Sequence, residues 1–187
     1  MSTPLSPEAA RTWQLLADRV ADERDPRVKG NLEMVARHVE AEVRGDIPDL
    51  MSTLTAEPSY SFVGATDSVG PEGYEAVVGH YEWLVATGKN RLEFEVTRVV
   101  ADEQTVITEG VFRHAFTGET LLGRRFTGEV ELDPIAWYLA EYQALVVWRM
   151  SSDGLIEGED IYAAEPPRVV GRLAPGERPH LGPVNRD

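Results

Sequence analysis

The sequence has no cysteine among its 187 residues, which excludes disulfide bonds, thiolate nucleophiles and cysteine-ligated metals. Basic residues are scarce, since 18 Lys and Arg stand against 32 Asp and Glu and give a formal net charge of −14. Nucleic acids and anionic membrane surfaces both attract clustered Lys and Arg, so we expect neither as a partner. Apolar runs also stay well short of the roughly 18 residues that a membrane-spanning helix requires.

Motifs that hold phosphates or metals are missing as well. There is no Gly-rich phosphate loop, and the histidines at positions 38, 80, 114 and 180 lack HxH or HExxH spacing. We therefore predict no metal site and no cofactor. The first 20 residues contain acidic side chains and no apolar core, so we expect no export signal and a cytoplasmic protein.

A chain of this length with 42% hydrophobic residues is expected to form one domain around one core. The stretch from Leu32 to Thr53 has apolar residues at the three-to-four spacing of a helix with one buried face. Gly45-Asp46 interrupts this spacing, which predicts a long helix, a glycine break and a short second helix. His38 lies at the edge of the buried face and is the first residue here suited to chemistry.

Other elements follow from their own periodicity. Residues 6–23 predict a helix that begins at Ser6-Pro7-Glu8 and is either packed on the domain or offered to a second subunit. Residues 60–64 alternate as a strand, and residues 73–87 predict a helix closed by Gly88. The period then changes to 2, and we expect four strands at 91–100, 105–116, 145–150 and 155–162.

Helices followed by an antiparallel meander predict an α+β fold with helices on one face of a curved sheet. We divide the chain into a helical extension (1–25), the main α+β domain (26–164) and a Pro/Gly-rich tail (165–187). Within the domain, residues 118–140 are expected to form an extended hairpin or flap. The tail is either mobile or pinned across the surface.

This order of elements resembles the nuclear transport factor 2-like superfamily, in its SnoaL-like branch of polyketide cyclases and ketosteroid isomerases. Three stretches carry the resemblance: ARHVEAEVRGDI (36–47), GPEGYEAVVGHYEWL (70–84) and VVWRMSSDGLIEGEDIY (146–162). It covers roughly residues 28–163. The resemblance implies a cone-shaped α+β barrel in which the N-terminal helices pack on the concave face of the sheet. It also implies that the open end of the cone holds a small apolar molecule and that the protein is a homodimer.

The functional residues of these relatives carry over only in part. His38 falls at the position of the isomerase's oxyanion-hole tyrosine, where an imidazole N–H can make the same hydrogen bond. Val63 and Val146 stand where the isomerase has its two aspartates, which argues against steroid isomerisation by that mechanism. The Arg-x-Asp pair of limonene epoxide hydrolase has no match, because Arg113 is followed by His114.

Three residues are the predicted catalytic set. His38 offers a near-neutral pKa and a hydrogen-bond donor on either nitrogen, although a core-edge histidine bonded to a carbonyl has the same pattern. His80 shares a helix face with Val77 and Leu84, or else lies on the surface. Asp160 is expected to face the cavity with Ile156, Gly158 and Tyr162, where burial would raise its pKa; in the alternative, Glu157, Glu159 and Asp160 form an acidic strand edge.

The predicted substrate-binding residues are mostly aromatic side chains at strand or helix spacing, which fit a pocket wall and a packed core equally well. Glu109 is either a site residue or half of an ion pair with Arg98 or Arg113. Asp67, in the loop after the first strand, is either at the cavity mouth or part of an ordinary turn. The full set is Tyr60, Phe62, Tyr81, Phe94, Glu109, Trp148 and Tyr162.

These observations favour a cofactor-independent enzyme that performs acid–base chemistry, an isomerisation, dehydration or cyclisation, on a small hydrophobic substrate. The alternative is a non-catalytic module that binds a hydrophobic ligand or a protein partner. A third possibility is a structural dimer whose cone is filled by its own side chains. Which face of each strand points into the cone decides among these three possibilities. A slip of one residue in the alternation would reverse the two faces.

Overall fold

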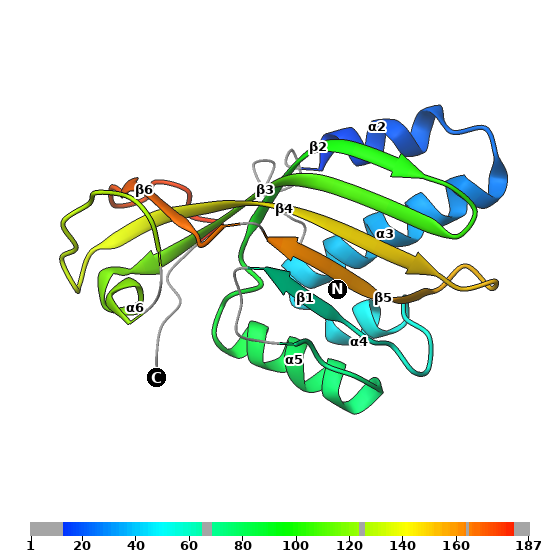
Figure 1. Ribbon diagram of the computed structural model, residues 1–187, viewed down its shortest axis with the longest axis horizontal. Helices are drawn as coiled ribbons and strands as arrows, with labels where there is room; N and C mark the ends of the chain where they lie inside the picture. Colours follow the sequence, from blue (N-terminus) through cyan, green and yellow to red (C-terminus); the bar gives the residue numbers. More distant parts are fainter. Residues whose placement is uncertain (1–12, 65–68, 124–125, 164, 182–187) are drawn as a thin grey trace.

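The computed structural model describes residues 13–64, 69–123, 126–163 and 165–181, and in it helices line one side of a long curved sheet (Figure 1). Pairing follows the order β1-β5-β4-β3-β2, with β6 paired to β4; β1 and β5 are parallel and the other neighbours antiparallel. Within the described residues β1 and β2 do not pair with each other, so the sheet does not close on itself. The strands are β1 (Ser61–Gly64), β2 (Glu93–Ala101), β3 (Thr105–Thr117), β4 (Trp137–Met150), β5 (Ile156–Ala163) and β6 (Arg168–Arg172).

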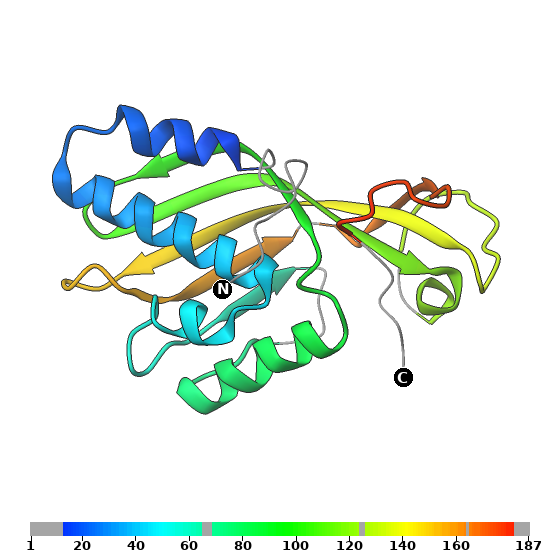
Figure 2. The same cartoon turned by 180° about the vertical axis from the view of Figure 1, so that it is seen from behind.

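The longest helix, α3 (Pro26–Arg44), lies across the concave face of the sheet (Figure 2). It begins where the Asp25 carboxylate accepts hydrogen bonds from the amides of Arg27 and Val28, which satisfies free N–H groups of the first turn. It ends at Gly45, whose φ of 69° suits glycine. The short helix α4 (Ile47–Met51) follows directly, so the predicted helix, glycine break and short helix are confirmed.

Two further helices of the described residues belong to the helical layer. Helix α2 (Gln14–Asp22) packs on the domain, with Leu16 only 1% exposed in the main core. The Ser6-Pro7-Glu8 start expected for it lies outside the described residues. Helix α5 (Tyr74–Ala86) directs Val77 and Tyr81 into the same core. Together with the sheet, these helices confirm the predicted α+β cone.

Strands β3 and β4 extend beyond the helices and form an arm (Figure 1). Within the expected flap at 118–140, the structure has the short helix α6 (Gly118–Leu122), irregular backbone over 126–136 and the first residues of β4. Strand β6 comes from the tail and pairs with the first part of β4. The arm has its own small core, which includes Phe116, Leu121, Tyr138 and Val169.

The tail beyond β6 is held against the outer side of the sheet as far as Leu181. The Nη1 atom of Arg178 lies 2.7 Å from Oε1 of Glu93, and Nε2 of His180 lies 2.7 Å from the same oxygen. Leu181 is fully buried against Ala115 and Leu139. Of the two alternatives for the tail, the described part is pinned.

A β-bulge in β5 changes which side chains face the helices. Arg149 pairs with Gly158 and Met150 with Ile156, so Glu157 is an extra residue in β5. Because the bulge shifts the alternation by one residue, Glu159 faces inward and is 5% exposed. Gly158 has a φ of 156°, and a Cβ added there would lie 1.7 Å from the carbonyl oxygen of Ser59. The bulge therefore requires glycine.

Replacing Gly158 with alanine is expected to lower the free energy of unfolding by on the order of 3 kcal/mol, through this clash and the backbone strain. Gly171→Ala in β6 is the matched control, because its added Cβ meets nothing within 4 Å and should change stability by less than about 0.5 kcal/mol. Urea denaturation measures both. Equal effects of the two substitutions would contradict the packing described for the bulge.

Candidate functional site

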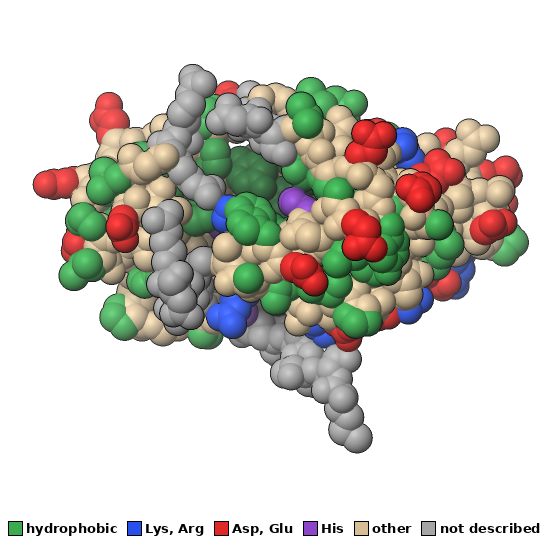
Figure 3. Space-filling model, turned by 90° about the horizontal axis from the view of Figure 1, so that it is seen from below, with side chains coloured by type: hydrophobic (Ala, Val, Ile, Leu, Met, Phe, Trp, Pro, Cys, Tyr) green, Lys and Arg blue, Asp and Glu red, His purple; other side chains and the backbone are tan. Residues whose placement is uncertain are grey.

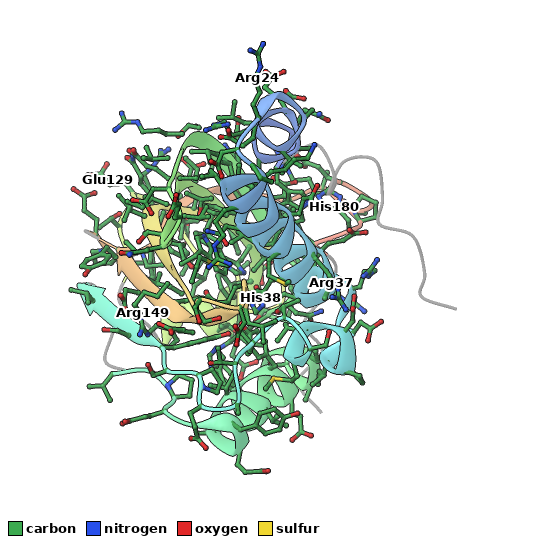
Figure 4. All side chains as sticks on the ribbon, turned by 90° about the vertical axis from the view of Figure 1, so that its right-hand side faces the viewer. Arg24, Arg37, His38, Glu129, Arg149 and His180 are labelled. Atoms are coloured by element: carbon green, nitrogen blue, oxygen red, sulfur yellow. The ribbon has the colours of Figure 1, made fainter. Side chains whose placement is uncertain are left out.

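His38 is completely buried and is hydrogen-bonded through both ring nitrogens. It points from α3 into the interior, whereas its neighbour Arg37 points outward (Figure 4). Its Nδ1 atom lies 2.7 Å from Oγ1 of Thr53, and its Nε2 atom lies 2.9 Å from the hydroxyl of Tyr81. Thr53 follows α4, so the glycine break after α3 allows α4 to turn back and place this hydroxyl beside the ring.

A carboxylate and a second tyrosine complete the group that we call the His38 cluster: His38, Thr53, Tyr60, Tyr81 and Glu159. Glu159 Oε1 lies 3.1 Å from the imidazole Nε2 and accepts a hydrogen bond of 3.0 Å from the Tyr81 hydroxyl. The Tyr60 hydroxyl lies 2.8 Å from that of Tyr81. The cluster thus joins α3, α5, β5 and the segment before β1 in one buried polar network.

Aromatic side chains enclose the cluster. The ring of Trp148 packs edge-on against His38 at 5.5 Å, and its indole N–H donates to Thr108 at 2.9 Å. Burial raises the pKa values of Tyr60 and Tyr81 well above 10, and the charge of Glu159 raises them further. Both hydroxyls therefore remain protonated donors at neutral pH.

Glu42 lies one helical turn after His38, so both side chains are on the same face of α3. Burial raises the pKa of Glu42 to about 8, and the charge of Glu159 contributes to the increase. The residue remains partly exposed, unlike His38. Glu42 in turn helps to raise the pKa of Tyr142, for which burial is the main cause. A carboxyl group that changes charge near neutral pH therefore lies beside the buried cluster.

The raised pKa of Glu42 predicts that stability depends on pH. The folded protein holds this proton up to about pH 8, whereas the unfolded chain releases it near pH 4.5. The contribution of Glu42 to stability is therefore most favourable below that lower value and falls as the pH rises toward 8. This fall in the free energy of unfolding should be on the order of 3 kcal/mol, and we expect it to be absent from the Glu42→Gln variant. Urea titrations from pH 5 to 9 measure this; identical pH dependences of wild type and variant would contradict the burial of a protonated Glu42.

His80 lies on α5 next to the cluster, half-buried between aromatic rings. Its ring centroid is 5.4 Å from that of Tyr81 and 5.6 Å from that of Phe62. Burial lowers the pKa of His80, and the nearby Lys89 lowers it further, although Glu159 opposes the change. His80 is therefore a neutral imidazole at neutral pH. It makes ring contacts with Tyr60 and Tyr81 rather than a hydrogen bond to His38.

A row of rings continues from the core toward the arm along the concave face of the sheet. Phe94 stacks on Phe112 at 4.1 Å, and Phe112 lies 5.3 Å from Tyr142 with nearly parallel planes. His114 lies 6.0 Å from Tyr142, and Phe116 follows at 5.6 Å from His114. This aromatic row gives the concave face an apolar wall beside Glu42.

Three of the predicted site residues on the sheet do not face the His38 cluster. Asp160 faces outward and pairs with Arg149 at 3.3 Å, and Tyr162 is 46% exposed, because the bulge at Glu157 reverses their alternation. Glu109 lies on the outer face, where it pairs with Arg98 at 3.2 Å and accepts a hydrogen bond from Gln143. The ion-pair alternative for Glu109 is the one that the structure shows. The candidate at position 67 lies outside the described residues.

Sequence reasoning missed both acidic residues of the site. Simple alternation places Glu159 on a solvated strand edge, since nothing in the sequence marks a bulge. Glu42 had a usable signal, because it is four residues after His38 and an (i, i+4) pair shares a helix face. The remaining predicted residues lie close together: His38, Tyr60 and Tyr81 in the cluster, Trp148 and Phe94 in the core around it, and His80 and Phe62 at its edge.

The surface is hollowed between the helical half and the arm, with hydrophobic side chains at the bottom and a histidine at the edge (Figure 3). Two grooves lie elsewhere, and neither contains a residue of the His38 cluster. One, of about 370 Å³, runs along α3 beside Asp153, and the other, of about 480 Å³, lies between α4 and α5.

Among the described residues no group of three His, Asp or Glu could hold a metal, and no described helix is long and apolar enough to cross a membrane.

The structure therefore defines an open α+β cone with helices over its concave face and a buried polar cluster inside. The sequence profile of the SnoaL-like domain matches residues 35–159. The chain therefore belongs to the SnoaL-like family. No curated protein shows significant sequence similarity to it.

Solved structures show the same fold at low identity. A putative SnoaL-like polyketide cyclase from Jannaschia sp. CCS1 has a TM-score of 0.56 and 17% identity, over 76% of this chain and 90% of that one. Bal32a, from a soil-derived mobile gene cassette, has a TM-score of 0.53 and 14% identity, over 73% and 91%. The epoxide hydrolase/cyclase-like enzyme SalBIII, from pyran ring formation in salinomycin, has a TM-score of 0.51 and 13% identity, over 72% of this chain and 90% of that one.

Proposed function

We propose that the protein is a cofactor-independent enzyme that transfers protons to and from a small hydrophobic substrate bound between Glu42 and the aromatic row. The observation that carries this proposal is the position of Glu42. It is a partly exposed carboxyl group with a pKa of about 8, one helical turn from the buried His38 cluster. A group whose pKa is near the working pH serves as both acid and base.

Each nearby side chain has a role in this proposal. Glu42 removes a proton from the substrate and returns it at another atom, as an isomerisation, dehydration or cyclisation requires. The hydroxyl of Tyr142, which burial keeps protonated, donates to the negative oxygen that develops. The rings of Phe94 and Phe112 hold the apolar part of the substrate. His38 is enclosed by its partners, so it acts through Glu159, whose charge helps to raise the pKa of Glu42.

The names of structural neighbours support this class of chemistry, since SalBIII is described as an epoxide hydrolase/cyclase-like enzyme and the Jannaschia protein as a putative polyketide cyclase. At identities below 20% they support the fold and a small-molecule pocket, and the reaction stays a proposal. The homodimer, the cytoplasmic location and the division at residues 25 and 164 also stay predictions.

The test is deuterium incorporation from D₂O into a panel of small hydrophobic ketones and thioesters, followed by mass spectrometry. This assay detects proton transfer whatever product the enzyme forms. We expect incorporation above the rate in buffer for at least one compound class. Retention of a hydrophobic compound from the panel with no exchange and no altered product would overturn the enzyme proposal in favour of the binding module.

A further inference from the structure

Thr53 can act only as a hydrogen-bond acceptor toward His38. Its hydroxyl carries one proton, and Oγ1 lies 2.5 Å from the carbonyl oxygen of Leu50, which has no proton to give. The proton must therefore lie between these two oxygens. Since Oγ1 is also 2.7 Å from Nδ1 of His38, the proton in that second hydrogen bond belongs to the imidazole. Nδ1 of His38 is protonated.

The other end of the ring holds an exchangeable proton. Nε2 lies 2.9 Å from the Tyr81 hydroxyl and 3.1 Å from Glu159 Oε1. The Tyr81 hydroxyl supplies one proton, which cannot serve both the carboxylate and a bare Nε2. With a neutral ring and an ionised Glu159, two lone pairs would face each other across 3.1 Å. One more proton, on Nε2 or on Glu159, makes this contact attractive.

We infer that Thr53 is a positioning residue that holds a proton on Nδ1 of His38 and thereby confines the exchangeable proton of the cluster to Nε2 and Glu159, beside Tyr81. The position of this proton follows from the geometry alone, and only its role in catalysis rests on the proposed function. In the proposed enzyme, it would give proton movement through the cluster a fixed direction. A proton can enter or leave the cluster only at the end that includes Tyr60 and Glu159, and Glu159 is the group that influences Glu42.

Groups on every packed element influence this proton. Glu159 comes from β5, Tyr81 and His80 from α5, Tyr60 from the segment before β1, and Glu42 from α3 itself. Tyr81 and Tyr60 keep their own protons, since burial raises their pKa values. His80 is neutral, since burial lowers its pKa. The exchangeable proton is therefore shared between the imidazole and the carboxylate.

The experiment is NMR of ¹⁵N-histidine-labelled full-length protein without substrate, with correlations that separate Nδ1–H from Nε2–H. The chain has four histidines, so substitution of His80, His114 and His180 assigns the signals of His38. We expect Nδ1–H at every pH at which the protein is folded. Whenever the ring carries a single proton, that proton should be on Nδ1.

Thr53→Ser and Thr53→Val form a matched pair. Serine keeps the hydroxyl and should retain the wild-type pattern. Valine removes the acceptor, so a ring with a single proton should carry it on Nε2, where Glu159 accepts it, and the Nδ1–H correlation of that form should disappear. Thr53→Ala replaces valine should that variant not fold.

A bare Nδ1 in the wild-type protein, or the same spectrum for serine and valine variants, overturns the inference. A merely structural role for Thr53 would lower stability without exchanging the two nitrogens. Because these spectra need no substrate, the inference can fail while the deuterium assay succeeds, and the reverse can also occur.

Discussion

Glu42→Gln is expected to lower the rate of deuterium incorporation by about 100-fold to 10,000-fold, the range that a general acid–base group contributes. Glutamine has nearly the same size as glutamate and can occupy the same place on α3, but its amide neither accepts nor releases a proton near neutral pH. The affinity for the substrate should change much less, because the aromatic row remains. Initial rates at several substrate concentrations separate kcat from KM.

Glu40→Gln is the control for this prediction. Glu40 lies on the same helix and is exposed, and it pairs with Arg44 at 2.9 Å. Its replacement should leave the rate unchanged, since surface pairs of this kind contribute little. A Glu42→Gln variant that keeps wild-type kcat would remove Glu42 from the proposed mechanism, and an equal loss in both variants would point to a general effect of charge on α3.

Local sequence signals predict the helices of this protein well. The apolar spacing of residues 32–53 and the glycine at 45 act locally, so the end of α3 and the start of α4 lie where these signals predict them. The same signals place His38 at the buried face. They carry no information about its partners, because Thr53, Tyr81 and Glu159 are 15, 43 and 121 residues away in the chain.

Strand faces are harder to predict, since one bulge reverses every residue after it. Because of the bulge at Glu157, Glu159 faces inward in place of Asp160. An irregularity in the pairing of β2 between Val96 and Arg98 leaves the side chain of Val100 54% exposed. Each follows from contacts made in the folded sheet, such as the approach of Ser59 to Gly158. The pairing of β6 with β4 depends likewise on contacts that no local pattern contains.

Glu159→Ala is expected to lower the free energy of unfolding by about 3–5 kcal/mol, the cost of removing one partner from a buried charged pair. His38 and Tyr81 would both lose the oxygen that they contact at 3.1 and 3.0 Å. Glu157→Ala is the matched control, because Glu157 is an exposed glutamate of the same strand. It should cost less than about 0.5 kcal/mol. Urea denaturation of both variants tests which glutamate faces inward.

A double-mutant cycle with His38→Gln shows whether the cost of losing Glu159 comes from its partner or from its surroundings. Once His38 is replaced, Glu159 has no imidazole to pair with, so its removal should cost less by about 1–3 kcal/mol, the range of coupling between residues in contact. Additive effects would mean that Glu159 is held by Tyr81 alone. In that case no proton is shared between Nε2 and the carboxylate, and Glu159 would raise the pKa of Glu42 as an isolated charge.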